Sequence, residues 1–142
     1  MGLRLKIEGN ESIQLNETIV TGVQFGADIP KDSNARSTDL GSTIAITGKI
    51  LAAVGGEAAD DTMKIAKWAL VPAESADCYR RLEITVINAS QVVRQVTFTN
   101  AFVIGYEENF ADESGVGEFK LLVKQKKDKM AELAFEGGFA GE

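Results

Sequence analysis

Apolar and polar residues alternate along most of this chain. Near its start, Leu3, Leu5 and Ile7 are separated by charged residues, so their side chains share one face of an extended backbone. A period of two is typical of a β-strand with one buried face. The pattern recurs within the stretches 13–25, 42–50, 82–86, 92–98, 102–106, 119–123 and 130–135. The alternation therefore predicts about eight strands.

Three of these strands follow one another with short connections. Residues 88–90 are expected to form a turn, and Asn100 is expected to begin a further strand. In that strand, the alternation predicts that Phe102, Ile104 and Tyr106 share a face. Consecutive strands with short turns favour an antiparallel meander.

A single stretch has the spacing of a helix. Asp60 and Asp61 are residues that favour a helix start, and Pro72 follows as a residue that ends one. Between them, Met63 and Leu70 recur with Ala66 at helical spacing. The helix is expected to cover one end or side of the sheet, with these residues turned inward: Ile65, Ala66, Trp68, Ala69 and Leu70.

A long polar segment interrupts the strands. Gly26 to Gly41 is rich in Gly, Asp, Ser and Asn and has no periodic apolar face, so we expect a loop of about 15 residues. A loop of that length inside a compact domain is usually functional or disordered. We expect a sheet of this size to close, because exposed edges promote aggregation.

The predicted fold class is mainly β: a small antiparallel β-barrel of about eight strands with one short α-helix and a long extended loop. Residues 1–136 are expected to form one domain, and residues 137–142 a flexible, glycine-rich tail.

Composition excludes several classes of function. The 142 residues include no histidine, so Ser-His-Asp and Cys-His catalytic pairs and histidine metal sites are excluded. Cys78 is the only cysteine, so no disulfide within the chain is possible. A net charge of -6 argues against nucleic-acid binding. We therefore expect a protein that is not an enzyme and binds no cofactor or metal.

The sequence also suggests where the chain folds. No apolar stretch is long enough to span a membrane, and the first residues lack the apolar core of a signal peptide. We expect folding in the cytoplasm, without membrane insertion.

Charge is distributed unevenly near the C-terminus. An acidic segment, Glu107 to Gly117, is expected to be a turn, and a lysine segment, Lys120 to Lys129, follows it. Two interpretations stay open. The carboxylates and lysines can be a solvated turn and a guarded edge strand. Alternatively, the two segments pair between neighbouring copies of the chain.

Three segments resemble one family of proteins. They are PKDSNARSTDLGSTIAIT from Pro30, DDTMKIAKWALVP from Asp60, and FTNAFVIGYEENF from Phe98 to Phe110. In this order, the chain resembles the haemolysin-coregulated protein (Hcp) of type VI secretion and the tail-tube proteins of contractile phage-like injection systems. The resemblance covers about residues 3–127. The glycine-rich end and the lack of histidine differ from better-known type VI members, so the choice between the two subclasses stays open.

The resemblance implies a function. A member of this family is a small β-barrel that forms homohexameric rings, which stack into a hollow tube inside a sheath. It implies as partners the chain itself, the sheath, the baseplate or spike, and cargo carried in the tube. It also implies secretion or ejection as part of the tube, or a place in a phage-like particle.

The alternative hypothesis is a monomeric β-barrel binding module that uses its long loop to hold a ligand or partner. For the tube hypothesis, the residues expected at contacts between copies are Pro30, Lys31, Asp32, Asn34, Arg36 and Asp39 in the loop, Glu107 and Glu108 in the acidic segment, and Lys124, Lys126 and Lys127 in the lysine segment.

Overall fold

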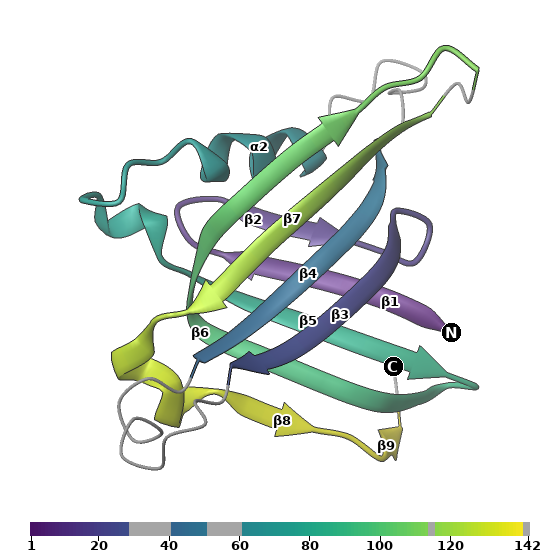
Figure 1. Cartoon of the computed structure of the whole chain (residues 1–142). Helices are drawn as coiled ribbons and strands as arrows, with labels where there is room; N and C mark the ends of the chain where they lie inside the picture. The colour runs from purple at the N-terminus through teal and green to yellow at the C-terminus, as the bar shows by residue number, and fades with distance from the viewer. Residues whose placement is uncertain (29–40, 51–60, 114–115, 141–142) are drawn as a thin grey trace.

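The computed structural model describes residues 1–28, 41–50, 61–113 and 116–140. All nine strands of these residues belong to one antiparallel sheet (Figure 1). The strands are β1 Gly2–Glu8, β2 Ser12–Leu15, β3 Val20–Asp28, β4 Gly41–Ile50, β5 Arg80–Asn88, β6 Gln91–Asn109, β7 Gly117–Gln125, β8 Ala134–Glu136 and β9 Phe139–Ala140. The helical segments are α2 Asp61–Ala69, η1 Ala76–Cys78 and η2 Lys127–Glu132.

The sheet curves until its two halves face each other. Its strand order is β2-β1-β5-β6-β7-β4-β3, and β8 and β9 pair with β6. Figure 1 shows β3, β4 and β7 crossing in front of β1 and β5. The edge strands β2 and β3 do not pair with each other in the described residues, so the barrel is open along this seam. The predicted fold class, mainly β and antiparallel with a short α-helix, is confirmed.

Strand β6 connects the two halves. Its N-terminal part pairs with β5 and its C-terminal part pairs with β7. Asn100 lies inside this 19-residue strand, so the prediction that a new strand begins there is wrong. The backbone N–H of Asn100 donates to the Gln125 side chain at 2.9 Å, and its carbonyl accepts from the N–H of Lys126, also at 2.9 Å. These bonds hold the strand together where it changes partners.

Bulges change which side chains of β6 face the core. The pairing register shifts between Val103 and Gly105, and a bulge of this kind bends a strand and re-aims its side chains. Val103 and Tyr106 consequently pack against the core, while Ile104 is 46% exposed. The prediction that Phe102, Ile104 and Tyr106 share one face is therefore wrong.

The core lies between the two halves of the sheet. Ile44 and Ile46 of β4 and Leu82 and Ile84 of β5 are buried, as their alternation predicted. The other large apolar side chains of this core are Leu5, Ile7, Ile13, Leu15, Ile65, Trp68, Phe98, Phe119, Leu121 and Val123. Helix α2 contributes Ile65 and Trp68 to this cluster.

Helix α2 turns a different face to the core than its spacing suggested. Thr62, Ile65 and Trp68 are buried, whereas Met63 is 56% and Leu70 is 82% exposed. Ile65 and Trp68 were correctly placed inward, but the inward placement of Leu70 was wrong. Apolar residues lie on two neighbouring faces of the helix. Only the face that carries the Trp68 indole is covered by the core.

The connections are shorter than the sequence suggested. The strand pairing of β3 with β4 extends to Asp28 opposite Gly41, so residues 26–28 and 41 are strand and not loop. Strand β6 likewise includes Glu107 and Glu108, so these carboxylates are not in the turn. Residues 88–90 do form the predicted turn, with positive φ angles of 52° at Ala89 and 64° at Ser90.

The C-terminal residues include a short strand. Phe139 and Ala140 pair with Val92 and Gln91, and the N–H of Gly138 donates to the Val92 carbonyl at 2.8 Å. Residues 141 and 142 lie outside the described residues. The division into a domain of residues 1–136 and a flexible tail stays a prediction.

Candidate assembly surfaces

The acidic residues of the predicted interface lie on β6 near the β6–β7 connection. Glu107 and Glu108 are exposed, and the hydroxyl of Tyr106 donates to a carboxylate oxygen of Glu108 at 2.6 Å. Opposite them on β7 are Lys120 and Phe119. We call Glu107 and Glu108 the acidic end of the molecule.

The pairing of β6 with β7 corrects one expectation about charge. Lys120 belongs to the lysine segment but lies directly opposite Glu107 of the same chain. Opposite charges at facing positions of an antiparallel pair are close enough to attract each other. This part of the lysine segment therefore needs no second copy to meet a carboxylate.

The remaining lysines lie at the other end of β7. Lys124 is in the strand, Lys126 follows it, and Lys129 is in η2. The ammonium of Lys126 is 5.0 Å from the centre of the Tyr79 ring and 3.7 Å from the Asp128 carboxylate. We call Lys124, Lys126 and Lys129 the lysine end of the molecule. The side chain of Lys127 lies outside the described residues.

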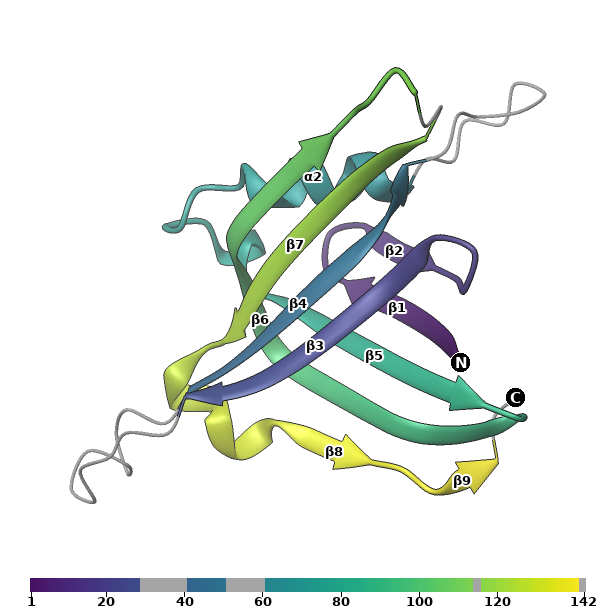
Figure 2. The same cartoon turned by 45° about the vertical axis from the view of Figure 1, so that its right-hand side comes forward.

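The acidic end and the lysine end are well separated. From Lys120 to Lys126 the chain is extended, and six residues of strand span about 20 Å. Figure 2 shows the β6–β7 connection at one extremity of the sheet and η2 at the opposite extremity. The structure therefore places the predicted acidic and basic interface residues on two surfaces and does not bring them together within one copy.

The strand ends that carry the long loop lie at the lysine end. Asp28 closes the pairing with Gly41, and Thr43 of the same strand faces Lys124. The hydroxyl of Ser42 is 3.6 Å from the sulfur of Met130 in η2. The loop residues Pro30, Lys31, Asp32, Asn34, Arg36 and Asp39 themselves lie outside the described residues.

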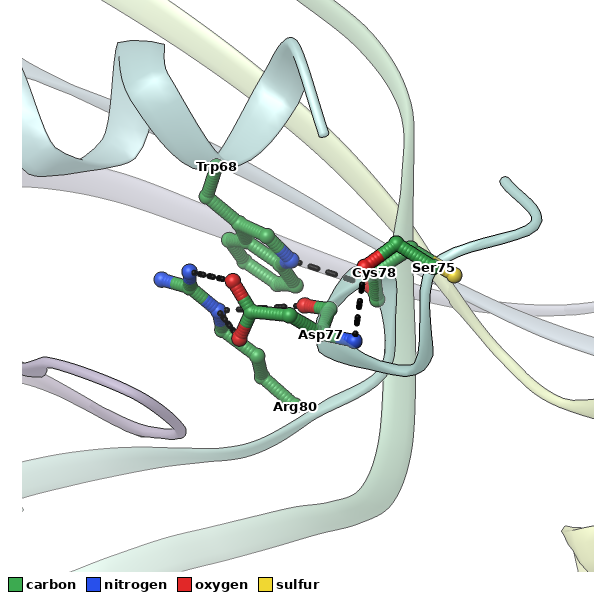
Figure 3. A network of polar contacts seen from close by, with 5 residues as sticks. All are labelled: Trp68, Ser75, Asp77, Cys78 and Arg80. Carbon is green, nitrogen blue, oxygen red and sulfur yellow. Dashed lines mark hydrogen bonds and ion pairs between the residues drawn. The ribbon is translucent and has the colours of Figure 1, made fainter. Parts of the chain in front are cut away.

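A buried polar network fixes α2 to the start of β5 (Figure 3). The Trp68 indole N–H donates to the Cys78 carbonyl at 3.0 Å. The Arg80 guanidinium donates to both carboxylate oxygens of Asp77, at 2.7 and 3.2 Å, and lies 5.5 Å from the centre of the indole. Arg80 holds the pKa of the Asp77 carboxyl below its usual value, because the ion pair favours the charged form. Sequence reasoning did not find this network, and its role is structural.

Chemistry-bearing groups are not gathered elsewhere in the part of the chain that the structure describes. Cys78 is buried, and its sulfur lies 3.5 Å from the Ala73 carbonyl. Within residues 1–28, 41–50, 61–113 and 116–140, no cluster of three or more potential metal ligands occurs. None of the helices in these ranges has the length and apolar character to cross a membrane.

The fold occurs in solved structures, although no protein-family model and no curated protein matches this chain. Hcp1 from Flavobacterium johnsoniae superposes with a TM-score of 0.56 at 16% identity, covering 98% of this chain and 99% of that chain. A chain of the anti-feeding prophage baseplate has a TM-score of 0.54 at 11% identity, covering 95% of this chain and 92% of its own. A chain of the PVC extracellular contractile injection system, in its sheath-tube complex, has a TM-score of 0.53 at 11% identity, covering 96% of this chain and 88% of its own.

These matches concern the whole domain and not one motif. They confirm, at the level of the fold, the resemblance to Hcp and to contractile tube proteins that the sequence segments indicated. Because one fold can carry many functions, the likeness by itself describes architecture.

Proposed function

We propose that this chain is a structural subunit of the inner tube of a contractile injection apparatus, of the type VI secretion or phage-tail kind. The subunits assemble into hexameric rings, and the rings stack into a hollow tube. The observation that carries the proposal is the likeness, over nearly the whole chain, to Hcp1 and to a chain of a sheath-tube complex. In this role the protein is not an enzyme, and its function is contact with other copies.

The position of the charged residues supports the proposal. A subunit that stacks in one direction needs two different surfaces that fit each other, because head-to-tail contacts propagate instead of closing as pairs. This chain has an acidic end and a lysine end at opposite extremities of its sheet. The further partners in this role are the sheath, the baseplate or spike, and cargo inside the tube. The subunit folds in the cytoplasm and leaves as part of the tube or particle.

We expect the purified protein to form rings, and stacks of rings at higher concentration. Negative-stain microscopy shows the rings directly, and sedimentation velocity gives the mass of the assembly relative to the 15.2 kDa chain. A protein that stays monomeric over a hundredfold range of concentration, about 1 to 100 μM, contradicts the proposal. That result favours the monomeric binding module.

The long loop is expected to contribute to stacking. Deleting residues 32–38 removes polar chain between two strand ends that remain paired, so the domain is expected to keep its thermal midpoint within a few degrees. We expect the variant to form rings but few stacks in micrographs. A control that replaces the same residues with a Gly/Ser segment of equal length separates loop chemistry from loop length. Tubes of normal length from the deletion would show that the loop is not a stacking contact.

A further inference from the structure

An apolar groove runs between helix α2 and strand β6. Ala66 and Ala69 of the helix and Leu70, which directly follows it, line one side, and Val103 and Ile104 of the strand line the other. Leu70 is 82% exposed, although leucine is among the residues most often buried. The groove therefore exposes apolar surface on an element whose opposite face is fully packed against the core.

The strand side of the groove is formed by a bulge. The register shift between Val103 and Gly105 removes Ile104 from the regular alternation and leaves it 46% exposed on the groove side. Bulges that re-aim a side chain are usually structural devices and not defects. Two unrelated features thus expose apolar side chains to the same groove. One is the apolar face of α2 that the core does not cover, and the other is the bulge of β6.

Carboxylates border this groove. Glu107 and Glu108, which define the acidic end, also line it next to the apolar residues. An occupant that complements the groove therefore combines apolar groups with positive charge. Within the described residues, α2 contributes no charged side chain to the lining.

The lysine end of the same chain supplies positive charge. The side chains of Lys126 and Lys129 are 40% and 42% exposed. Each forms an ion pair within its own chain, at 3.7 Å from Lys126 to Asp128 and 3.9 Å from Lys129 to Glu132, and exposed pairs of this kind contribute only about 0 to 1 kcal/mol. The aromatic rings of Phe25 and Phe135, 4.7 Å apart between centres, are both partly exposed on β3 and on β8, the strand that follows η2.

We propose that the groove between α2 and β6 is the docking site for the lysine end of a second copy of this chain. The inference rests on the proposed function and names the contact that stacks one ring on the next. Glu107 and Glu108 meet the lysines, and Leu70 and Ile104 lose their exposure to water. Because the two surfaces differ, each docked copy presents a free groove for the next copy.

Charge reversal tests the pairing. We expect Glu107→Lys with Glu108→Lys to raise the protein concentration at which rings stack by about tenfold, and Lys126→Glu with Lys129→Glu to do the same. The four changes together should restore stacking in large part, because the charges are then exchanged between the two surfaces. A matched control for the lysine reversal, Lys6→Glu with Arg81→Glu, makes the same change in net charge on exposed residues of β1 and β5. This control should stack normally.

Leu70→Gln tests the apolar part of the groove. We expect this variant to stack less than the parent at equal concentration, while Met63→Gln, on α2 but outside the groove lining, stacks normally. The thermal midpoint of the unassembled Leu70→Gln protein should equal that of the parent, because the side chain is exposed. A lowered midpoint would mean that the chain's own residues fill the groove, and it would overturn the inference.

Two results separate this inference from the proposed function. If the parent forms stacked rings and the charge reversals stack normally, or the fourfold variant shows no recovery, the groove is not the contact and the tube function stands. If the parent is monomeric under all conditions, both the function and the inference are rejected. Normal stacking of Leu70→Gln also overturns the inference.

Discussion

Trp68→Ala is expected to lower the free energy of unfolding by about 3 to 5 kcal/mol. The indole is 1% exposed, and its N–H donates to the Cys78 carbonyl. The substitution leaves a cavity between α2 and the sheet, and it leaves that carbonyl without its indole partner. Most domains are stable by only about 5 to 15 kcal/mol, so this loss is a large share of the total.

Urea denaturation followed by circular dichroism measures this loss. The matched control is Leu70→Ala, directly after the same helix, which should change the free energy of unfolding by less than about 0.5 kcal/mol because its side chain is exposed. Equal midpoints for Trp68→Ala and the parent would show that the indole does not pack as the structure describes.

Gln125→Leu is expected to cost about 1 to 3 kcal/mol, which is the cost of burying an unpaired polar group. The Gln125 side chain is 1% exposed and accepts from the N–H of Asn100 at 2.9 Å. It donates to the carbonyl of Lys129 and to the hydroxyl of Thr99, both at 2.8 Å. Leucine has a similar size but can satisfy none of these groups.

Hydrogen exchange can locate the effect of this change. We expect faster exchange in η2 and around Asn100 than in β1 and β5, because Gln125 joins the lysine end to the middle of β6. Gln24→Leu on the exposed side of β3 is the matched control and should leave both stability and exchange nearly unchanged. Uniform exchange in both variants would contradict the role of Gln125 as an anchor.

The alternation of residues predicted most of the sheet because one face of each strand is packed. Ile44 and Ile46 illustrate this, since both are fully buried. The continuation of β6 through Asn100 was not predictable from the alternation. It depends on Gln125, which is 25 residues away in sequence and supplies the acceptor that a buried backbone N–H needs. The bulge at Ile104 was missed for a similar reason, because a register shift is a property of two strands together.

The residues of the candidate surfaces stay predictions. Charge alone suggested Glu107, Glu108, Lys124 and Lys126, because like charges cluster in the sequence. These carboxylates and lysines lie at opposite extremities of the sheet because β6 pairs with β7 in antiparallel fashion. The pattern of charges along the sequence does not predict this pairing. The groove was missed because Leu70 was assigned to the core. Its signal was present in the sequence, since α2 has more apolar residues than one buried stripe needs.

The length of β6 has a mechanical consequence. Because the two facing layers share this 19-residue strand, a force that slides one layer past the other acts along its continuous backbone. Its inter-strand hydrogen bonds with β5 and β7 are loaded in shear, so many must yield together instead of opening one after another. The two layers therefore resist this sliding as one body.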